Sequence, residues 1–281
     1  MPTVQVTGSL SPSRAGDFMT CPLLYRFRSI DKIPETPNPV MVRGTLVHAV
    51  LERLFDDPAP QRTLAHAVSM VPAEWQKLLT KSPELAELFA AGADFDGSVG
   101  VEAAQSEEAE WLASCTAFLD NYFRMEDPQY LEPEARELWV KHELDTGLTL
   151  RGIVDRIDVA PDGRIRVVDY KTGKSPNSRF EDKALFQMKF YALVIWRERG
   201  VIPTLLQLMY LGDGRFLRYE PIEADLLATE RKLQALWTAI AAAMTAHDFP
   251  PRKNPLCNWC AHKAICPEWG GTPPPMPVNS P

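Results

Sequence analysis

The chain has 281 residues, of which 45% are hydrophobic and 24% are charged, and its net charge at neutral pH is −7. This is the composition of an ordinary globular protein, long enough for one large domain or a domain with an elaboration. The sequence has no apolar run of about 18 residues or more, so no membrane span is expected, and its first residues lack the pattern of a signal peptide. The five cysteines, an odd number, speak against a disulfide framework and favour a reducing, cytoplasmic location.

The charge is distributed unevenly along the chain. Residues 81–120 contain one lysine and nine acidic residues, whereas residues 164–199 contain nine basic and four acidic residues. A basic region of an acidic protein can attract a polyanion, because salt screens remote charges beyond about 8 Å. On charge alone, a solvated helix face is the favoured interpretation.

Patterns typical of helices begin close to the N-terminus. Ser11 is a favourable N-cap because a proline follows it, and short helices are expected over residues 11–30. Residues 45–55 place apolar side chains at the spacing of one helix face. Further helices are expected over residues 60–127, with breaks at Pro72, at Pro83 and in the glycine-rich stretch 91–100.

The second half of the chain mixes strand-like and helical segments. Strands are expected at residues 137–144, 148–159 and 164–170, and a turn at residues 161–163 joins the last two of them. A second hairpin is expected around Asp213-Gly214, and helices at residues 183–199 and 223–247. The proline-rich tail, residues 270–281, is expected to be disordered.

The stretch RIRVVDYKTGKS, residues 164–175, ends in Gly-Lys-Ser like a phosphate-binding loop. A Walker loop needs a second glycine five positions before the Gly-Lys pair, and Val168 stands there instead. What remains is Asp169 and Lys171 at the end of an apolar strand. Residues two apart in a strand point to the same face, so the carboxylate and the ammonium are expected side by side.

The preceding strand carries Asp155 and Asp158. If the two strands form a hairpin, Asp155 and Asp169 lie close together at one end of it. Two carboxylates at that range repel unless a cation lies between them, and oxygen ligands suit Mg²⁺ or Mn²⁺. Lys171 would then orient a water molecule or offset charge on a phosphate. The alternative is a surface hairpin with an ordinary aspartate–lysine ion pair.

Four cysteines form a candidate site of a different kind. Cys257, Cys260 and Cys266 follow the spacing C-x2-C-x5-C in a polar segment, and Cys21 lies far upstream. Four thiolates can hold a tetrahedral zinc ion or a cubane iron–sulfur cluster, and this spacing fits both. Cys115, on an expected helix beside apolar residues, is expected to be a core residue.

Four motifs in chain order resemble those of the PD-(D/E)XK nuclease superfamily: RGTLVHAVLE at 43–52, GIVDRID at 152–158, VVDYKT at 167–172 and QMKFY at 187–191. Within it they are most similar to the RecB-type exonuclease branch, which includes CRISPR-associated and AddB-like iron–sulfur nucleases. The resemblance covers roughly residues 10–58 and 130–268. It implies that His48, Asp155 and Asp169 bind the metal ion and that Lys171 is the catalytic lysine.

The resemblance also implies roles for residues outside the metal ligands. Gln187 and Tyr191 are four apart, on one helical face, where they would contact a DNA backbone or position the lysine. Glu137 loosely matches an acidic position upstream of the first aspartate, and a solvent-facing strand glutamate is an equal alternative. The iron–sulfur branch has one cysteine before the nuclease motifs and three after them, which implies a structural 4Fe–4S cluster on Cys21, Cys257, Cys260 and Cys266.

The fold implied is an α/β, restriction-endonuclease-like mixed central sheet flanked by helices. Five segments are expected: N-terminal helices (10–58), a helical insertion that shapes a DNA channel (59–130), a nuclease core (131–250), a cysteine segment (251–269) that clasps the two ends of the chain, and the tail (270–281).

The function implied is a Mg²⁺- or Mn²⁺-dependent deoxyribonuclease acting on single-stranded DNA ends in DNA repair or recombination. The sequence contains no Walker loop and no helicase motor, unlike the large helicase–nuclease members, and whether a separate helicase or CRISPR partner supplies the substrate stays open. Two alternatives stay open: a nuclease that trims spacers in CRISPR adaptation, and a non-catalytic DNA-binding subunit of a larger complex. The intact set of two aspartates and a lysine speaks against the non-catalytic alternative.

Overall fold

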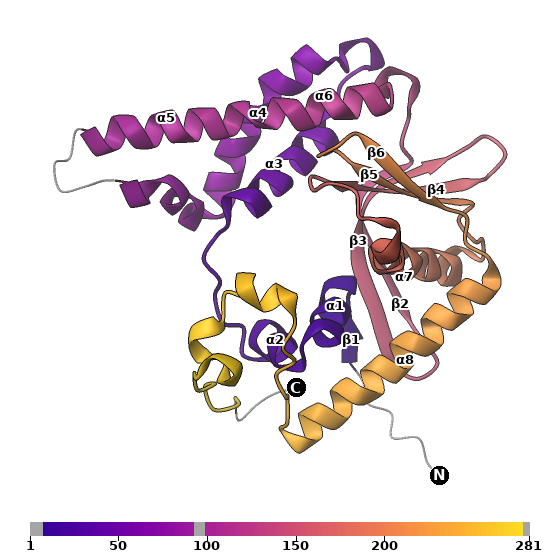
Figure 1. The fold of residues 1–281 in the computed structure, drawn as a ribbon. Coiled ribbons are helices and arrows are strands. Elements are labelled where there is room, and N and C mark those ends of the chain that lie inside the picture. Colours follow the sequence, from indigo (N-terminus) through magenta and orange to yellow (C-terminus); the bar gives the residue numbers. More distant parts are fainter. Residues whose placement is uncertain (1–7, 93–98, 278–281) are drawn as a thin grey trace.

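The computed structural model describes residues 8–92 and 99–277. Its centre is a mixed, six-stranded sheet in the order β1 (Gly8–Leu10), β3 (Leu148–Val159), β4 (Ile165–Lys171), β5 (Leu205–Tyr210) and β6 (Arg215–Tyr219), with β2 (Ala135–Glu143) also paired to β3. Helices flank the sheet, as Figure 1 shows. The α/β architecture expected from the sequence is therefore confirmed.

The long strand β3 organises the sheet because it pairs with three other strands. One of its edges is occupied by β2 along nearly its whole length. The opposite edge pairs with β1 up to Leu150 and with β4 from Arg156 onward. In the described chain, residues 151–155 of β3 therefore have no strand partner on this second edge. Asp155 lies in that interruption.

One core lies between the sheet and three helices. The helix α7 (Glu181–Arg199) packs against β2, β3, β4 and β5, while α8 (Glu223–Ala246) packs on α7 and α1 (Pro12–Thr20) on both. Ser11 caps α1 as expected, since its side chain accepts a hydrogen bond from the backbone of Arg14 at 3.3 Å. The buried side chains of this core come mainly from β3, β4, β5 and α7.

A second core joins the remaining helices to the sheet. It is built from α3 (Pro39–Leu54), α4 (Leu64–Lys81), α5 (Val99–Ala113), α6 (Cys115–Met125) and the 3₁₀ segment Pro83–Gly92. Val168 and Tyr170 of β4 and Met209 of β5 belong to this core, not to the first one. Neighbouring residues of β4 thus point alternately into the two cores, as the pleat of a strand requires.

The break expected at Pro72 is wrong, because α4 runs continuously from Leu64 to Lys81 with Pro72 inside it. A proline inside a helix removes one backbone hydrogen bond. In α4, the buried face of Ala67, Val71 and Trp75 holds the helix together across the proline. Pro83 does mark a change, from α4 to the 3₁₀ segment. Most of the glycine-rich stretch expected to break the helices falls at residues 93–98, outside the described part of the chain.

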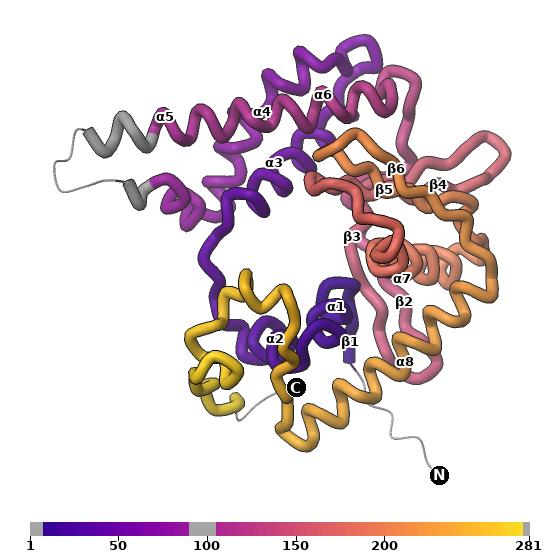
Figure 2. Tube along the Cα trace, viewed as in Figure 1, coloured from indigo at the N-terminus to yellow at the C-terminus, as the bar shows by residue number. Residues whose placement is uncertain are grey.

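The C-terminal segment lies beside the N-terminal helices. Figure 2 shows this segment next to α2 (Pro22–Tyr25) and near α1. It contains three 3₁₀ turns, Pro255–Trp259, Lys263–Ile265 and Pro267–Trp269. Arg252 donates a hydrogen bond to the carbonyl of Met19 at 2.7 Å. The described part of the tail has no helix or strand, yet Arg26 donates to the carbonyl of Pro274 and Met276 packs on the core, which differs from the expected disorder.

No described helix combines the length and the apolar character that crossing a membrane requires.

Candidate active site

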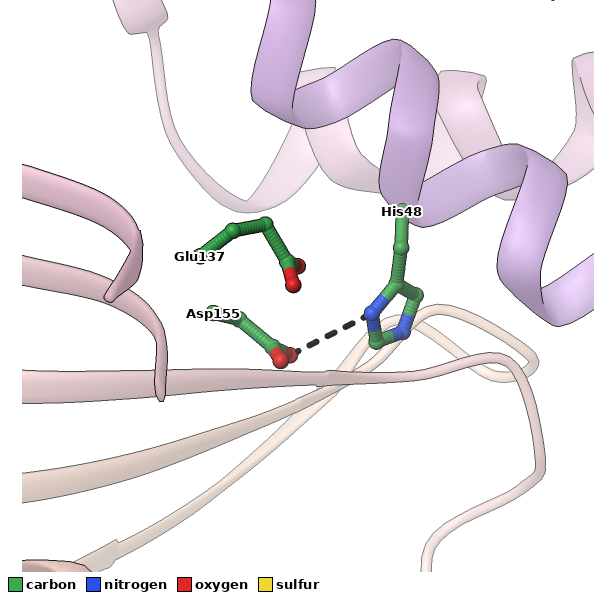
Figure 3. Close-up of side chains that lie close together, drawn as sticks. All are labelled: His48, Glu137 and Asp155. Atoms are coloured by element: carbon green, nitrogen blue, oxygen red, sulfur yellow. Dashed lines mark ion pairs between the residues drawn. The ribbon is translucent and has the colours of Figure 1, made fainter. Parts of the chain in front are cut away.

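Three candidate metal ligands from three different elements meet at the interruption in the β3 edge. His48 lies on α3, Glu137 on β2 and Asp155 on β3, and Figure 3 shows their side chains converging. One ligand atom of each lies within 4.8 Å of the others. The Nδ1 atom of His48 is 3.4 Å from a carboxylate oxygen of Asp155. Burial lowers the pKa of His48, which keeps its imidazole in the neutral form that binds metal ions.

Glu137 reaches this group from an unusual backbone position. Its φ is 45°, in the left-handed region, although it lies inside strand β2. Such a conformation in a residue other than glycine costs about 1–3 kcal/mol and is found mainly at functional sites. The strand pairs on both sides, Leu138 with Val154 and Arg136 with Arg156, hold it there. Glu137 is half-buried and lies close to His48 and Asp155, so it is a candidate ligand.

Asp155 is held by the neighbouring strand. At this point β3 and β4 no longer form a ladder, and the Asp155 carboxylate accepts a hydrogen bond from the backbone N–H of Tyr170 at 2.7 Å. Burial, and next the charge of Asp169, raise the pKa of Asp155 well above its usual value. A divalent cation relieves this kind of repulsion between two carboxylates.

Asp169 and Lys171 emerge side by side, as the strand spacing predicts. The Nζ atom of Lys171 lies 2.6 Å from Asp169 Oδ2. Asp169 is only 1% exposed, and its Oδ2 atom has no hydrogen-bond donor in addition to this ion pair. A buried carboxylate oxygen that keeps a free lone pair is a suitable ligand for a hard cation. His48, Glu137 and Asp155 form a donor set that fits a Mg²⁺ or Mn²⁺ ion. Asp169, the other expected ligand, is not among these three, although its charge acts on both His48 and Asp155.

Gln187 and Tyr191 of α7 complete the cluster. Gln187 accepts a hydrogen bond from Lys171 at 3.0 Å through its Oε1 atom, and its Nε2 atom donates to Asp169 at 2.9 Å and to the Tyr191 hydroxyl at 3.1 Å. The amide of Gln187 therefore holds the lysine and the aspartate in one fixed arrangement. Tyr191 in turn packs closely on Gly152: a Cβ atom there would come within 2.7 Å of the Tyr191 ring, so only glycine fits.

Arg156 lies directly behind the metal ligands and was not identified from the sequence. It is completely buried, pairs with Glu126 and Asp158, and donates to the Tyr170 hydroxyl at 2.7 Å. The Tyr170 ring in turn contacts the imidazole of His48 edge-on, with 5.8 Å between ring centroids. The available sequence signal was an arginine within a largely apolar strand. If such a guanidinium is buried, it needs several partners.

The four expected cysteines also come together. Cys21, Cys257, Cys260 and Cys266 all line one cavity of about 260 Å³ between α1, α2 and the C-terminal turns. Backbone N–H groups point at two of the sulfurs, from Arg252 to Cys21 and from Asn254 to Cys257, each at 3.3 Å. Cys115 is fully buried in the second core, which confirms the expectation that it is a core residue.

Ion pairs neutralise part of the positive charge of the basic segment 164–199. Four of its nine basic residues are arginines that pair with carboxylates: Arg164 with Asp162, Arg166 with Asp158, Arg197 with Glu230 and Arg199 with Glu134. Surface ion pairs of this kind neutralise charge locally and contribute little stability. These four arginines fit the solvated-face interpretation better than polyanion binding.

The sequence matches the model of a known protein family. The model of the PD-(D/E)XK nuclease superfamily matches residues 9–267. Gene 69 protein of Mycobacterium phage D29 is 27% identical over 272 residues, which cover 92% of this chain and 96% of that protein. Gene 69 protein of Mycobacterium phage L5 is 26% identical over 289 residues, covering 92% and 95%.

One solved structure aligns over most of both chains. A candidate exonuclease from Eubacterium rectale aligns with a TM-score of 0.48 at 12% sequence identity, covering 90% of this chain and 87% of that one. The family match spans both the N-terminal helix that carries His48 and the strands that carry Asp155, Asp169 and Lys171. The chain therefore belongs to the PD-(D/E)XK nuclease superfamily.

Proposed function

We propose that this protein is a metal-dependent deoxyribonuclease that hydrolyses phosphodiester bonds at the ends of single-stranded DNA, in repair or recombination. The observation that carries the proposal is the convergence of His48, Glu137 and Asp155, from α3, β2 and β3, beside the Asp169–Lys171 ion pair of β4, whose aspartate acts electrostatically on both His48 and Asp155. Nucleases of this superfamily need carboxylates and a lysine at such a site, and here each of them is held by further contacts. A subunit that had lost catalysis would have no physical reason to keep that set intact.

The metal would be held by His48, Glu137 and Asp155, whose ligand atoms converge, with Asp169 as the further ligand that the sequence motif implies. When bound, a divalent cation supplies a Lewis acid that polarises the phosphate and lowers the pKa of a coordinated water. An imidazole among oxygen ligands makes Mn²⁺ a better fit than Mg²⁺, because Mn²⁺ accepts nitrogen ligands more readily.

Lys171 is the protein side chain that would act directly on the phosphate. Its ammonium group is fixed by Asp169 and by the Gln187 amide, so it can aim a proton or a positive charge at the phosphate without rearranging. Tyr191 holds the other side of that amide. The pair on α7 therefore positions the lysine, which was one of the two roles considered for it.

We further propose that the four cysteines hold a 4Fe–4S cluster that clasps the two ends of the chain. All four cysteines line one cavity, and backbone N–H groups point at two of the sulfurs, which supports a sulfur-ligated group there. The choice of iron over zinc rests on the order of the cysteines along the chain, one before the nuclease motifs and three after them.

A nuclease assay tests the proposed function directly. End-labelled single-stranded and double-stranded DNA would be incubated with the purified protein in EDTA, in Mg²⁺ and in Mn²⁺. We expect no cleavage in EDTA, cleavage with both metals, a higher rate with Mn²⁺, and a preference for single strands with free ends. Cleavage at an undiminished rate in EDTA would show that the metal mechanism is wrong.

A further inference from the structure

A solvent-exposed strip of mixed aromatic and basic character lies on strands β2 and β3. Trp139 and Lys141 of β2 are paired with Ile153 and Arg151 of β3, respectively. Cross-strand partners share a face of the sheet, and residues two apart share it as well, so these four side chains form one continuous strip. Trp139 is 56% exposed and Ile153 is 43% exposed. We name these four residues the open sheet face.

The chemistry of the open sheet face is that of a nucleic-acid contact. The guanidinium of Arg151 lies over the indole of Trp139, 6.0 Å from the ring centroid. Trp139, Lys141 and Arg151 line a broad hollow of about 630 Å³, which continues to Ser9 of β1. An exposed indole beside two cations suits a base that stacks and phosphates that need positive charge. The hollow also includes Glu143, at the end of β2 farthest from the metal ligands.

The open sheet face begins where the metal site ends. Trp139 follows Glu137 by two residues on β2, and Ile153 precedes Asp155 by two residues on β3. Two residues of a strand span about 7 Å, so the exposed indole lies one such step along the strand from a candidate metal ligand. The basic pair, Lys141 and Arg151, lies one step farther from the metal. The same two strands therefore carry both the candidate ligands and the strip.

We propose that the open sheet face binds the single-stranded part of the substrate that leads to or from the metal site. A base would stack on Trp139, and Lys141 and Arg151 would contact the phosphates beyond it. This inference rests on the proposed function, because it names the path of the strand that the metal site would cut. It would give an acidic protein a DNA contact outside the segment 164–199, in which four of the five arginines are paired with carboxylates.

Binding without cleavage tests this inference separately from catalysis. Fluorescence anisotropy of a labelled, long oligothymidine strand would be measured in EDTA for the full-length wild type, for Trp139→Ala and for Trp139→Phe. Loss of one stacking side chain is expected to weaken binding about fivefold or more. Phenylalanine keeps an aromatic face and should recover most of that loss. Tyr130→Ala is the matched control, because Tyr130 is an aromatic residue that is 86% exposed and lies outside the strip.

The basic pair makes a different prediction. Arg151→Ala and Lys141→Ala should each weaken binding and lower the slope of log affinity against log salt by about 0.7, the value for one phosphate contact to a single strand. In Mn²⁺, the KM for a long strand should rise in these variants, while cleavage of a dinucleotide, too short to reach the strip, should stay unchanged. Wild-type protein that binds strands but cuts nothing in Mn²⁺ would refute the nuclease proposal and leave the binding result standing.

Two outcomes would overturn the inference. The first is wild-type affinity in Trp139→Ala, which would show that no base stacks on this indole. The second is unchanged DNA binding together with a changed molar mass in light scattering, which would make the open sheet face an interface between two copies of the chain.

Discussion

The metal site and the cysteine site differ in what holds them in place. The metal-site residues lie on long elements, α3, β3, β4 and α7, whose side chains fill the two cores. The cysteine segment consists of three short 3₁₀ turns that contain no buried residue. Asp169, for example, is 1% exposed, whereas all four cysteines are only partly buried.

This difference separates a site that the fold forms in advance from one that depends on its ligand. At the metal site, Lys171, the N–H of Tyr170 and the Gln187 amide already compensate the buried carboxylates. Removing the metal should therefore abolish chemistry and leave the fold largely intact. At the cysteine site, few contacts hold the segment apart from those to α1 and α2, so removing the bound group should loosen the ends of the chain.

The largest effect is expected at the cysteine site. Replacing Cys21 by Ser should bleach the brown colour of anaerobically purified protein and lower the free energy of unfolding by about 4–5 kcal/mol, by analogy with cross-links that close long loops. Iron and sulfide analysis, visible absorption and denaturant unfolding measure this. Cys115→Ala is the control and should keep the colour, because that thiol lies in the second core. Colourless wild-type protein with one zinc ion per chain would contradict the cluster.

The next effect is expected at the lysine. Lys171→Ala should lower the cleavage rate by about 10²–10³, since it removes one preorganised charge aimed at the transition state. The melting temperature and the Mn²⁺ affinity should change little, because the metal ligands stay in place. Lys174→Ala, an exposed lysine three residues on, serves as the control in the same single-turnover assay. A wild-type rate in Lys171→Ala would show that this lysine has no catalytic role.

A smaller effect is expected behind the metal ligands. Tyr170→Phe keeps the ring edge against His48 and removes only the hydroxyl that accepts from Arg156 at 2.7 Å. Loss of a hydrogen bond made to a metal ligand itself typically weakens metal binding at least tenfold. The Tyr170 hydroxyl bonds Arg156 and not a ligand, so we expect Mn²⁺ binding to weaken by less than about tenfold. Isothermal titration with Mn²⁺ alone measures it without any cleavage. Phe123→Leu, on the partly buried side of α6, is a control for general loosening of the second core.

The smallest effect concerns the contacts that hold the cysteine segment to the N-terminal helices. Glu35 bonds Arg28 at 2.6 Å and His262, next to the cysteines, at 2.8 Å. These bonds, first those of Arg28, lower the pKa of Glu35 below its ordinary value of 4.5. A lowered pKa means that the carboxylate stabilises the fold above pH 4.5 and that this contribution is lost as the pH falls through the folded-state pKa.

Glu35→Gln should therefore be less stable than the wild type at neutral pH by less than about 1 kcal/mol, since the group is partly exposed. The difference should shrink as the pH is lowered below 4.5. Urea unfolding at a series of pH values measures it. A difference that grows toward acid would contradict the sign of this linkage.

Much of this molecule could be predicted from its sequence because the signals are local. Alternation along β3 and β4, the helical spacing in α3 and α7, and turns such as that at Gly163 depend on residues close in the chain. The pairing of Asp169 with Lys171 follows from strand geometry alone. Cys21 was grouped with Cys257, Cys260 and Cys266 because the family resemblance implied it. All four line one cavity, which agrees with that grouping.

Other features were decided only by the tertiary structure. The interruption in the β3 edge arises because β1 and β4 share that edge, and pairing between distant strands leaves no local pattern. The left-handed backbone of Glu137 is held by pairs on either side of it, against its own preference. Pro72 stays inside α4, and Arg156 stays buried, because packing and ion pairs outweigh the tendencies that their residue types show in isolation. Local chemistry thus determined which residues could act, and long-range packing determined where they meet.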